Sequence, residues 1–196
     1  MAKKESTIVN MVLALFVITT ISAATLGFMF KLTEMPKKRA EIIKQNFAIL
    51  AVLPEFDNNP SAEYYKIESY DGGDSLTCFP AYKNGELAGI AVKTWTKKGF
   101  SGEIFLMAGF DHRGHIYSIT VLEHQETPGL GTKMADAEFK DQYYGKHPEI
   151  NNLSVKKNGG EIDAITAATI SSIAFSDAVE RAFKSLKRAG KYYEND

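Results

Sequence analysis

The sequence predicts an α+β fold, in which an antiparallel sheet with flanking helices follows one N-terminal transmembrane helix. Three observations lead to this prediction. Residues 8–30 contain no charged side chain. Five short runs rich in β-branched and aromatic residues occupy the middle of the chain, with turn residues between them. The C-terminal region carries one long helical repeat of apolar residues.

The uncharged segment at residues 8–30 is apolar enough to be a membrane anchor. A helix of this length measures about 34 Å, which exceeds a hydrocarbon core of about 30 Å. A cleaved signal peptide is the alternative, because Lys3 and Lys4 precede the segment and small residues occur at positions 22–24. The apolar run is longer than that of an ordinary signal peptide, which favours an uncleaved anchor.

The anchor divides the chain into parts of opposite charge. Residues 1–40 carry a net charge of +4 and residues 41–196 a net charge of −5. The acidic domain does not suggest a nucleic acid as partner. Lysine and arginine are more numerous after the anchor than before it, so the positive-inside rule by itself places the domain in the cytoplasm. The lone cysteine, Cys78, excludes an internal disulfide or a cysteine-ligated cluster and is interpreted as a core residue.

A connecting amphipathic helix is expected over residues 31–54. Thr33 is a candidate N-cap, Pro36 would lie in the first turn, and apolar residues from Ile42 to Leu50 recur before Pro54. The resulting division is an N-terminal tail (1–7), a transmembrane helix (8–30), this connecting helix (31–54) and a soluble domain (55–196).

The soluble domain begins with the antiparallel sheet. Strands are expected at residues 64–70, 76–82, 86–96, 103–111 and 115–123. Asn84-Gly85 joins the second and third strands and is a strong hairpin signal, because both residues tolerate the positive φ of a type I′ turn. A helix at residues 135–144 and a strand at residues 151–157 follow, and the last helix carries apolar residues at helical spacing from Ile170 to Leu186.

Two segments are too rich in small and polar residues to be ordinary core or surface. The first is Glu126-Thr127-Pro128-Gly129-Leu130-Gly131, whose glycines allow a backbone to approach a ligand closely, although taken alone it is a turn. The second is Asp163-Ala164-Ile165-Thr166-Ala167-Ala168-Thr169, followed by Ser171 and Ser172 at the start of the last helix. A helix N-terminus favours an anion such as phosphate, but taken alone this segment is better interpreted as one whose hydroxyls cap the helix.

The two segments together resemble the FMN-binding domain of the G subunit of the Rnf electron-transport complex. The C subunit of the sodium-translocating NADH:quinone oxidoreductase has a related domain. The resemblance covers essentially the whole chain, including His124 before the first segment and Phe100-Ser101-Gly102 after the third strand.

The resemblance implies an electron-relay subunit of an ion-translocating ferredoxin:NAD oxidoreductase. It implies FMN held covalently by a phosphoester to Thr169, the last threonine of the motif, where a flavin transferase attaches it from FAD. It further implies that these residues bind the cofactor: Asp163, Thr166, Ala167, Ala168, Ser171, Ser172, Glu126, Thr127, Gly129, Leu130, Gly131, Phe100 and Ser101. No catalytic acid, base or nucleophile is expected in this chain, so it acts as a redox subunit without independent catalysis.

One residue departs from the family pattern. Ala167 stands where the motif has glycine. Alanine suits a helix start or a bridge conformation, so we expect Ala167 to adopt one of these; a positive φ would cost about 1–2 kcal/mol.

The resemblance also implies partners and location. Other membrane and iron–sulfur subunits are expected around the chain, in a bacterial-type inner membrane, with the flavin domain on the outer face. This face conflicts with the charge count, and we follow the family. The alternatives are a flavoprotein of the sodium-translocating NADH:quinone oxidoreductase or an assembly subunit without a redox centre. A metal site is disfavoured, because His112 and His115 flank a turn instead of sharing a helical face.

Overall fold

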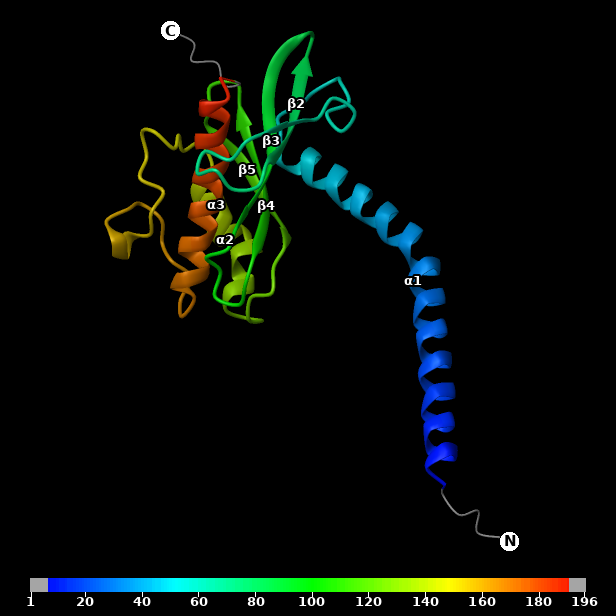
Figure 1. Ribbon diagram of the computed structural model, residues 1–196. Coiled ribbons are helices and arrows are strands. Elements are labelled where there is room, and N and C mark those ends of the chain that lie inside the picture. The colour runs from blue at the N-terminus through cyan, green and yellow to red at the C-terminus, as the bar shows by residue number, and fades with distance from the viewer. Residues whose placement is uncertain (1–6, 191–196) are drawn as a thin grey trace. The chain divides into compact units, whose positions relative to one another are not determined.

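The computed structural model describes residues 7–190, so most of the predicted tail, with Lys3 and Lys4, lies outside the described residues (Figure 1). The chain divides into two compact units, residues 1–43 and residues 44–196. The second unit contains the sheet and all of the predicted cofactor residues.

The N-terminal helix α1 runs without interruption over Ile8–Val52. By length and composition it is the one helix in the described part of the chain that could cross a bilayer. The prediction that a second helix begins at Thr33 is wrong. Thr33 lies inside α1, and its Oγ1 donates to the carbonyl of Met29 at 2.8 Å, so its hydroxyl is used within the helix instead of capping a new one.

The five predicted strands are present and form one antiparallel sheet in the order β1-β2-β3-β4-β5. The strands are β1 Tyr65–Ile67, β2 Leu76–Lys83, β3 Glu86–Thr96, β4 Ile104–Asp111 and β5 Ile116–Glu123. Asn84 and Gly85 have φ values of 55° and 83° and connect β2 to β3, as a type I′ hairpin requires. The fold class and the hairpin are therefore confirmed.

Helices cover both faces of this sheet. The last helix, α3 Thr169–Arg188, packs on one face, over a core that includes Val92, Leu106 and Phe175 (Figure 1). The last turns of α1 pack on the other face, where Ile49 and Val52 join a smaller core. Phe47 and Leu50, which we expected on the packed side of the connecting helix, are exposed. Gly109 of β4 lies so close to Val52 that an added Cβ would collide with its carbonyl oxygen.

The region between β5 and α3 differs from the prediction. In place of one helix at residues 135–144, three short helices follow each other. They are the 3₁₀ helix η1 Gly131–Ala135, the α-helix α2 Ala137–Lys140 and the 3₁₀ helix η2 Asp141–Tyr143. Asp136 separates the first two with an extended backbone (φ −72°, ψ 145°). Phe139 and Tyr143 pack in this broken form on Phe175, with ring centroids 5.2 and 5.1 Å from it. Tertiary packing thus outweighs the local helical preference.

The strand predicted at residues 151–157 is also absent. A single bridge joins Val155 to Ile162, and η3 Lys156–Asn158 follows. Side chains take the backbone donors that a neighbouring strand would otherwise bind: Asn152 N–H donates to Glu161 at 3.0 Å and Ser154 N–H to Asn152 at 3.1 Å. The segment is therefore a loop fastened by its own polar side chains.

Candidate functional site

A cavity of about 330 Å³ lies where the two predicted segments meet, which is the size of a small ligand site. The start of α3, the loop after β5 and the loop between β3 and β4 enclose it. Its lining includes these predicted residues: Phe100, Glu126, Thr127, Leu130, Gly131, Ala167, Ala168, Thr169 and Ser171. Segments that are far apart in the sequence thus form one site.

One buried carboxylate joins the three segments. Glu126 is 4% exposed. Its Oε2 accepts a hydrogen bond from Oγ of Ser171 at 2.7 Å, and its Oε1 accepts one from the backbone N–H of Ser101 at 3.1 Å. Gly131 lies against this pair, because an added Cβ would lie 2.7 Å from both Glu126 Oε2 and Ser171 Oγ. A side chain at position 131 would force the segments apart.

The start of α3 leaves its first backbone donors free. Ala168 is the N-cap, and no side chain caps the helix. The first backbone bond of the helix runs from Ser172 N–H to the Ala168 carbonyl at 3.1 Å. Within the described chain, the N–H groups of Thr169, Ile170 and Ser171 therefore have no acceptor, which makes this end of the helix suitable for an anion. The capping alternative for these hydroxyls does not hold.

The hydroxyl groups of this region differ in their availability. Ser172 is fully buried; its Oγ donates to the Ala168 carbonyl at 3.0 Å and accepts from Ile165 N–H at 3.0 Å, so it fastens the segment to the helix. The hydroxyl of Ser171 is bound to Glu126. Thr169 is half-buried and lines the cavity, and its hydroxyl has no partner among the described residues.

Ala167 does not have the conformation that we expected. Its φ is 60°, in the left-handed region that favours glycine. The expectation of a helix-start or bridge conformation is therefore wrong. Ala167 lies between Thr166, which lines a neighbouring hollow, and Thr169, which lines the cavity.

Asp163 and Thr166 do not line the cavity. Both lie beside a neighbouring hollow of about 170 Å³. Asp163 is exposed and pairs with Lys156 at 2.7 Å, and its backbone N–H donates to Gln142 at 2.8 Å. The side chains of Asp163 and Thr166 are therefore exposed, whereas Ile165 between them is buried in the core.

Gly129 and Ser101 support the cavity from behind its lining. Gly129 has a φ of 75° and donates its N–H to Thr132 Oγ1 at 2.9 Å, which closes the turn of the first segment. The backbone of Ser101 holds Glu126. Neither residue is part of the lining.

One lining residue was not predicted. Ile170 is 51% exposed and lies at the mouth of the cavity with Phe100 (67% exposed) and Leu130 (40% exposed). The sequence placed Ile170 in the apolar repeat of the last helix. A large apolar residue directly after the motif threonine, one turn before Ala174, the first buried apolar residue of α3, was the available signal.

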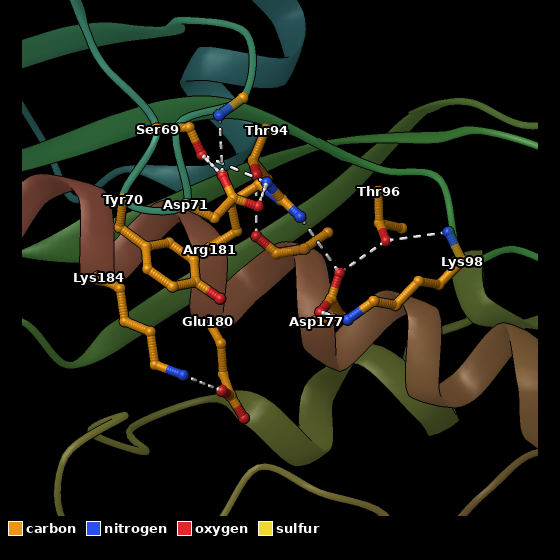
Figure 2. Close-up of polar contacts among 12 residues, drawn as sticks. Ser69, Tyr70, Asp71, Thr94, Thr96, Lys98, Asp177, Glu180, Arg181 and Lys184 are labelled. Carbon is orange, nitrogen blue, oxygen red and sulfur yellow. Dashed lines mark hydrogen bonds and ion pairs between the residues drawn. The ribbon is translucent and has the colours of Figure 1, made fainter.

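The loop that carries Phe100 is fixed at its start by polar contacts to α3 (Figure 2). Asp177 accepts from Thr96 Oγ1 at 2.7 Å and from Lys98 Nζ at 2.5 Å, and Arg181 lies 3.7 Å from it. Burial by itself raises the pKa of Asp177, but the hydrogen bonds from Lys98 and Thr96 outweigh it and hold the pKa below its usual range. The carboxylate thus stays ionised and ties the loop to the helix.

Arg181 extends the same network to the loop before β2 (Figure 2). Its side chain is buried, pairs with Asp71 at 2.5 Å and lies 4.5 Å from the ring centroid of Trp95. A hydrogen bond from Ser69, followed by the bond from Arg181, lowers the pKa of Asp71 to about 2. Arg181 thus fastens the loop before β2 to α3, and Asp177 fastens the loop that carries Phe100.

Comparisons with known proteins agree with this site. The family described as FMN-binding domain matches residues 99–184, which include both segments and the Phe100 loop. The chain is similar to the G subunit of the Na(+)-translocating ferredoxin:NAD(+) oxidoreductase complex of Acetobacterium woodii, with 31% identity over 190 residues and 91% of each chain covered. It is also similar to the G subunit of the ion-translocating oxidoreductase complex of Methanosarcina acetivorans, with 31% identity covering 89% of this chain and 92% of the relative.

A solved structure supports the fold. The C subunit of the Na(+)-translocating NADH-quinone reductase from Parabacteroides distasonis superposes with a TM-score of 0.58 at 20% identity, covering 84% of this chain and 98% of that chain. This likeness agrees with the predicted fold, and the relatives and the family model agree with the predicted family and cofactor type. The chain belongs to the family of G subunits of Rnf-type ion-translocating oxidoreductase complexes, and is an electron-transfer flavoprotein subunit of a membrane-associated complex.

Proposed function

We propose that this chain relays electrons within its complex through FMN attached by a phosphoester to Oγ1 of Thr169. The single observation that carries the proposal is the position of Thr169. It is the first residue of α3, it lines the cavity, and the unpaired N–H groups of the first helical turn lie beside its hydroxyl. A phosphate on this oxygen would be stabilised by those donors and by the helix dipole.

The other hydroxyls near the helix start are less suited to attachment. Those of Ser171 and Ser172 are buried and hydrogen-bonded. Thr166 is exposed beside the neighbouring hollow, on the other side of the turn at Ala167. Thr169 is the hydroxyl that is both free and directed to the cavity lining.

Attachment requires FAD and a flavin transferase. Oγ1 of Thr169 would attack the phosphorus on the FMN side of the FAD pyrophosphate, the bond to the AMP oxygen would break, and AMP would leave. The hydroxyl proton would pass to a base of the transferase. The exposed Asp163 and Thr166 would remain accessible to that enzyme, since neither is part of the cavity lining.

The chain's own residues would hold and shield the cofactor. The bound flavin supplies the electron-carrying chemistry. Phe100, Leu130 and Ile170 offer apolar contact area at the cavity mouth, and Gly131 allows the backbone to pass close to Glu126. We propose that this domain lies on the outer face of the membrane, with α1 as the anchor and the membrane and iron–sulfur subunits as partners.

The attachment is tested by flavin fluorescence of the denatured protein on a gel. The full chain is produced in a host with the transferase. Wild type should give a fluorescent band, Thr169→Ala should give none, and Thr166→Ala, the matched control, should retain it. A non-fluorescent wild-type band would refute the proposal and favour an assembly subunit without a redox centre. A reporter fused after Asp196, which lies outside the described residues, should be active only on the outer side.

A further inference from the structure

Glu126 is the one ionisable side chain in the lining of the described cavity. The other lining residues are apolar, glycine or hydroxyl-bearing. Glu126 is 4% exposed, so water does not screen its carboxylate directly. A charge in such surroundings acts more strongly on its neighbours than a charge on the protein surface.

The partners of this carboxylate are neutral. Its two oxygens accept from Ser101 N–H and Ser171 Oγ, and no Lys, Arg or His side chain of the described residues lies within ion-pair distance. His124 is the nearest titratable neighbour in its own loop, and its Nδ1 accepts from the backbone N–H of Glu126 at 3.1 Å. Both oxygens of the Glu126 carboxylate accept hydrogen bonds from these neutral donors.

We propose that Glu126 lowers the reduction potential of the flavin held in this cavity by keeping beside it a negative charge that has no ion-pair partner among the described residues. The inference rests on the proposed function, since it requires a flavin at this site. Reduction adds negative charge to a cofactor, and a fixed negative charge in a poorly screened site opposes that addition. The two hydrogen bonds hold the charge in place without neutralising it.

The test variant is Glu126→Gln, because glutamine has the same shape and can satisfy the same partners. Its amide oxygen can accept from Ser101 N–H, and its amide nitrogen can donate to Ser171 Oγ. The matched control is Glu123→Gln, which removes an exposed carboxylate at the end of β5, outside the cavity lining. Glu126→Asp retains the charge on a shorter side chain.

The measurement is a spectroscopic redox titration of the full-length, flavin-loaded protein in detergent. The reduction equilibrium constant should rise about tenfold in Glu126→Gln, which is about 30 mV for a two-electron couple. Glu123→Gln should change it far less, and Glu126→Asp should remain near wild type.

Three outcomes would overturn the inference. The first is a potential in Glu126→Gln equal to that of Glu123→Gln. The second is a Glu126→Asp potential that rises as far as that of Glu126→Gln, because the side-chain length would then matter instead of the charge. The third is a Glu126→Gln protein that carries no flavin, because the carboxylate would then serve attachment. A wild-type protein without flavin would instead refute the proposed function.

Discussion

Replacing Ala167 with glycine should stabilise the protein, although glycine usually does the opposite. Ala167 has a φ of 60° and is exposed at the edge of the cavity, so its methyl group contributes little packing. A left-handed conformation costs a residue with a Cβ about 1–2 kcal/mol. Glycine removes that cost. It also raises the conformational entropy of the unfolded chain, which lowers the free energy of unfolding by about 0.4–1 kcal/mol. The free energy of unfolding should therefore rise by about 0.5–1 kcal/mol.

The matched control lies in the same loop. Ala164 is only partly buried and is not among the described residues with a positive φ, so Ala164→Gly should lower the free energy of unfolding by about 0.5–1 kcal/mol. Thermal unfolding of the full chain in detergent compares the variants, and the expected rise for Ala167→Gly is about 1–4 °C. Flavin labelling measured on the same samples shows whether relief of this strain also changes attachment.

The opposite ordering would refute this reasoning. If Ala167→Gly destabilised the chain as much as Ala164→Gly, the positive φ would not be a source of strain, and the local turn geometry would have to be reconsidered.

Three further predictions follow from particular contacts. Gly131→Ala should lose flavin labelling and about 1–3 kcal/mol of stability, because the new Cβ would lie 2.7 Å from Ser171 Oγ; gel fluorescence and denaturant unfolding measure both, and an unchanged variant would contradict the close packing. Burial lowers the pKa of His147 below 6.5, so the unfolded chain binds the proton more readily and stability should decrease as the pH falls below 6.5; His147→Gln should flatten this part of the profile, and equal slopes would disprove the link. The hydrogen bond from Ser69 is the main factor that lowers the pKa of Asp71 from 3.8 to about 2, so its stabilisation should be complete above pH 4 and lost between pH 4 and 2; Asp71→Asn should lack that acid-dependent loss in unfolding experiments, and an unchanged profile would argue against it.

Much of the fold could be predicted because its signals are local. The runs rich in β-branched and aromatic residues and the Asn84-Gly85 turn predict the sheet, since both act through backbone geometry over a few residues. The segments between β5 and α3 could not be predicted in the same way. Phe139 and Tyr143 pack on Phe175 of α3, and that distant contact breaks the local helix.

In the candidate site too, some features could be predicted from local sequence and others depend on distant contacts. The sequence by itself predicted which segments form the candidate site: a glycine-rich loop and a motif ending in Thr169 at a helix start. It also predicted an apolar helix at residues 8–30, which is a candidate membrane span. Only the tertiary structure decided that the residues of the motif are divided between the cavity and a neighbouring hollow. Thr169 lines the cavity while Asp163 and Thr166 lie beside a neighbouring hollow.

The physical reason is that charge environment and backbone reversal depend on contacts between distant segments. Glu126 is a buried, hydrogen-bonded carboxylate because Ser101, in a loop 25 residues away in the sequence, and Ser171, in a helix 45 residues away, both bind it. Ala167 has a positive φ in a segment that Ile165 fastens to Ser172 of α3, next to Thr169 in the cavity lining. A residue's identity sets which interactions it can make, and the packed fold selects the one that it does make.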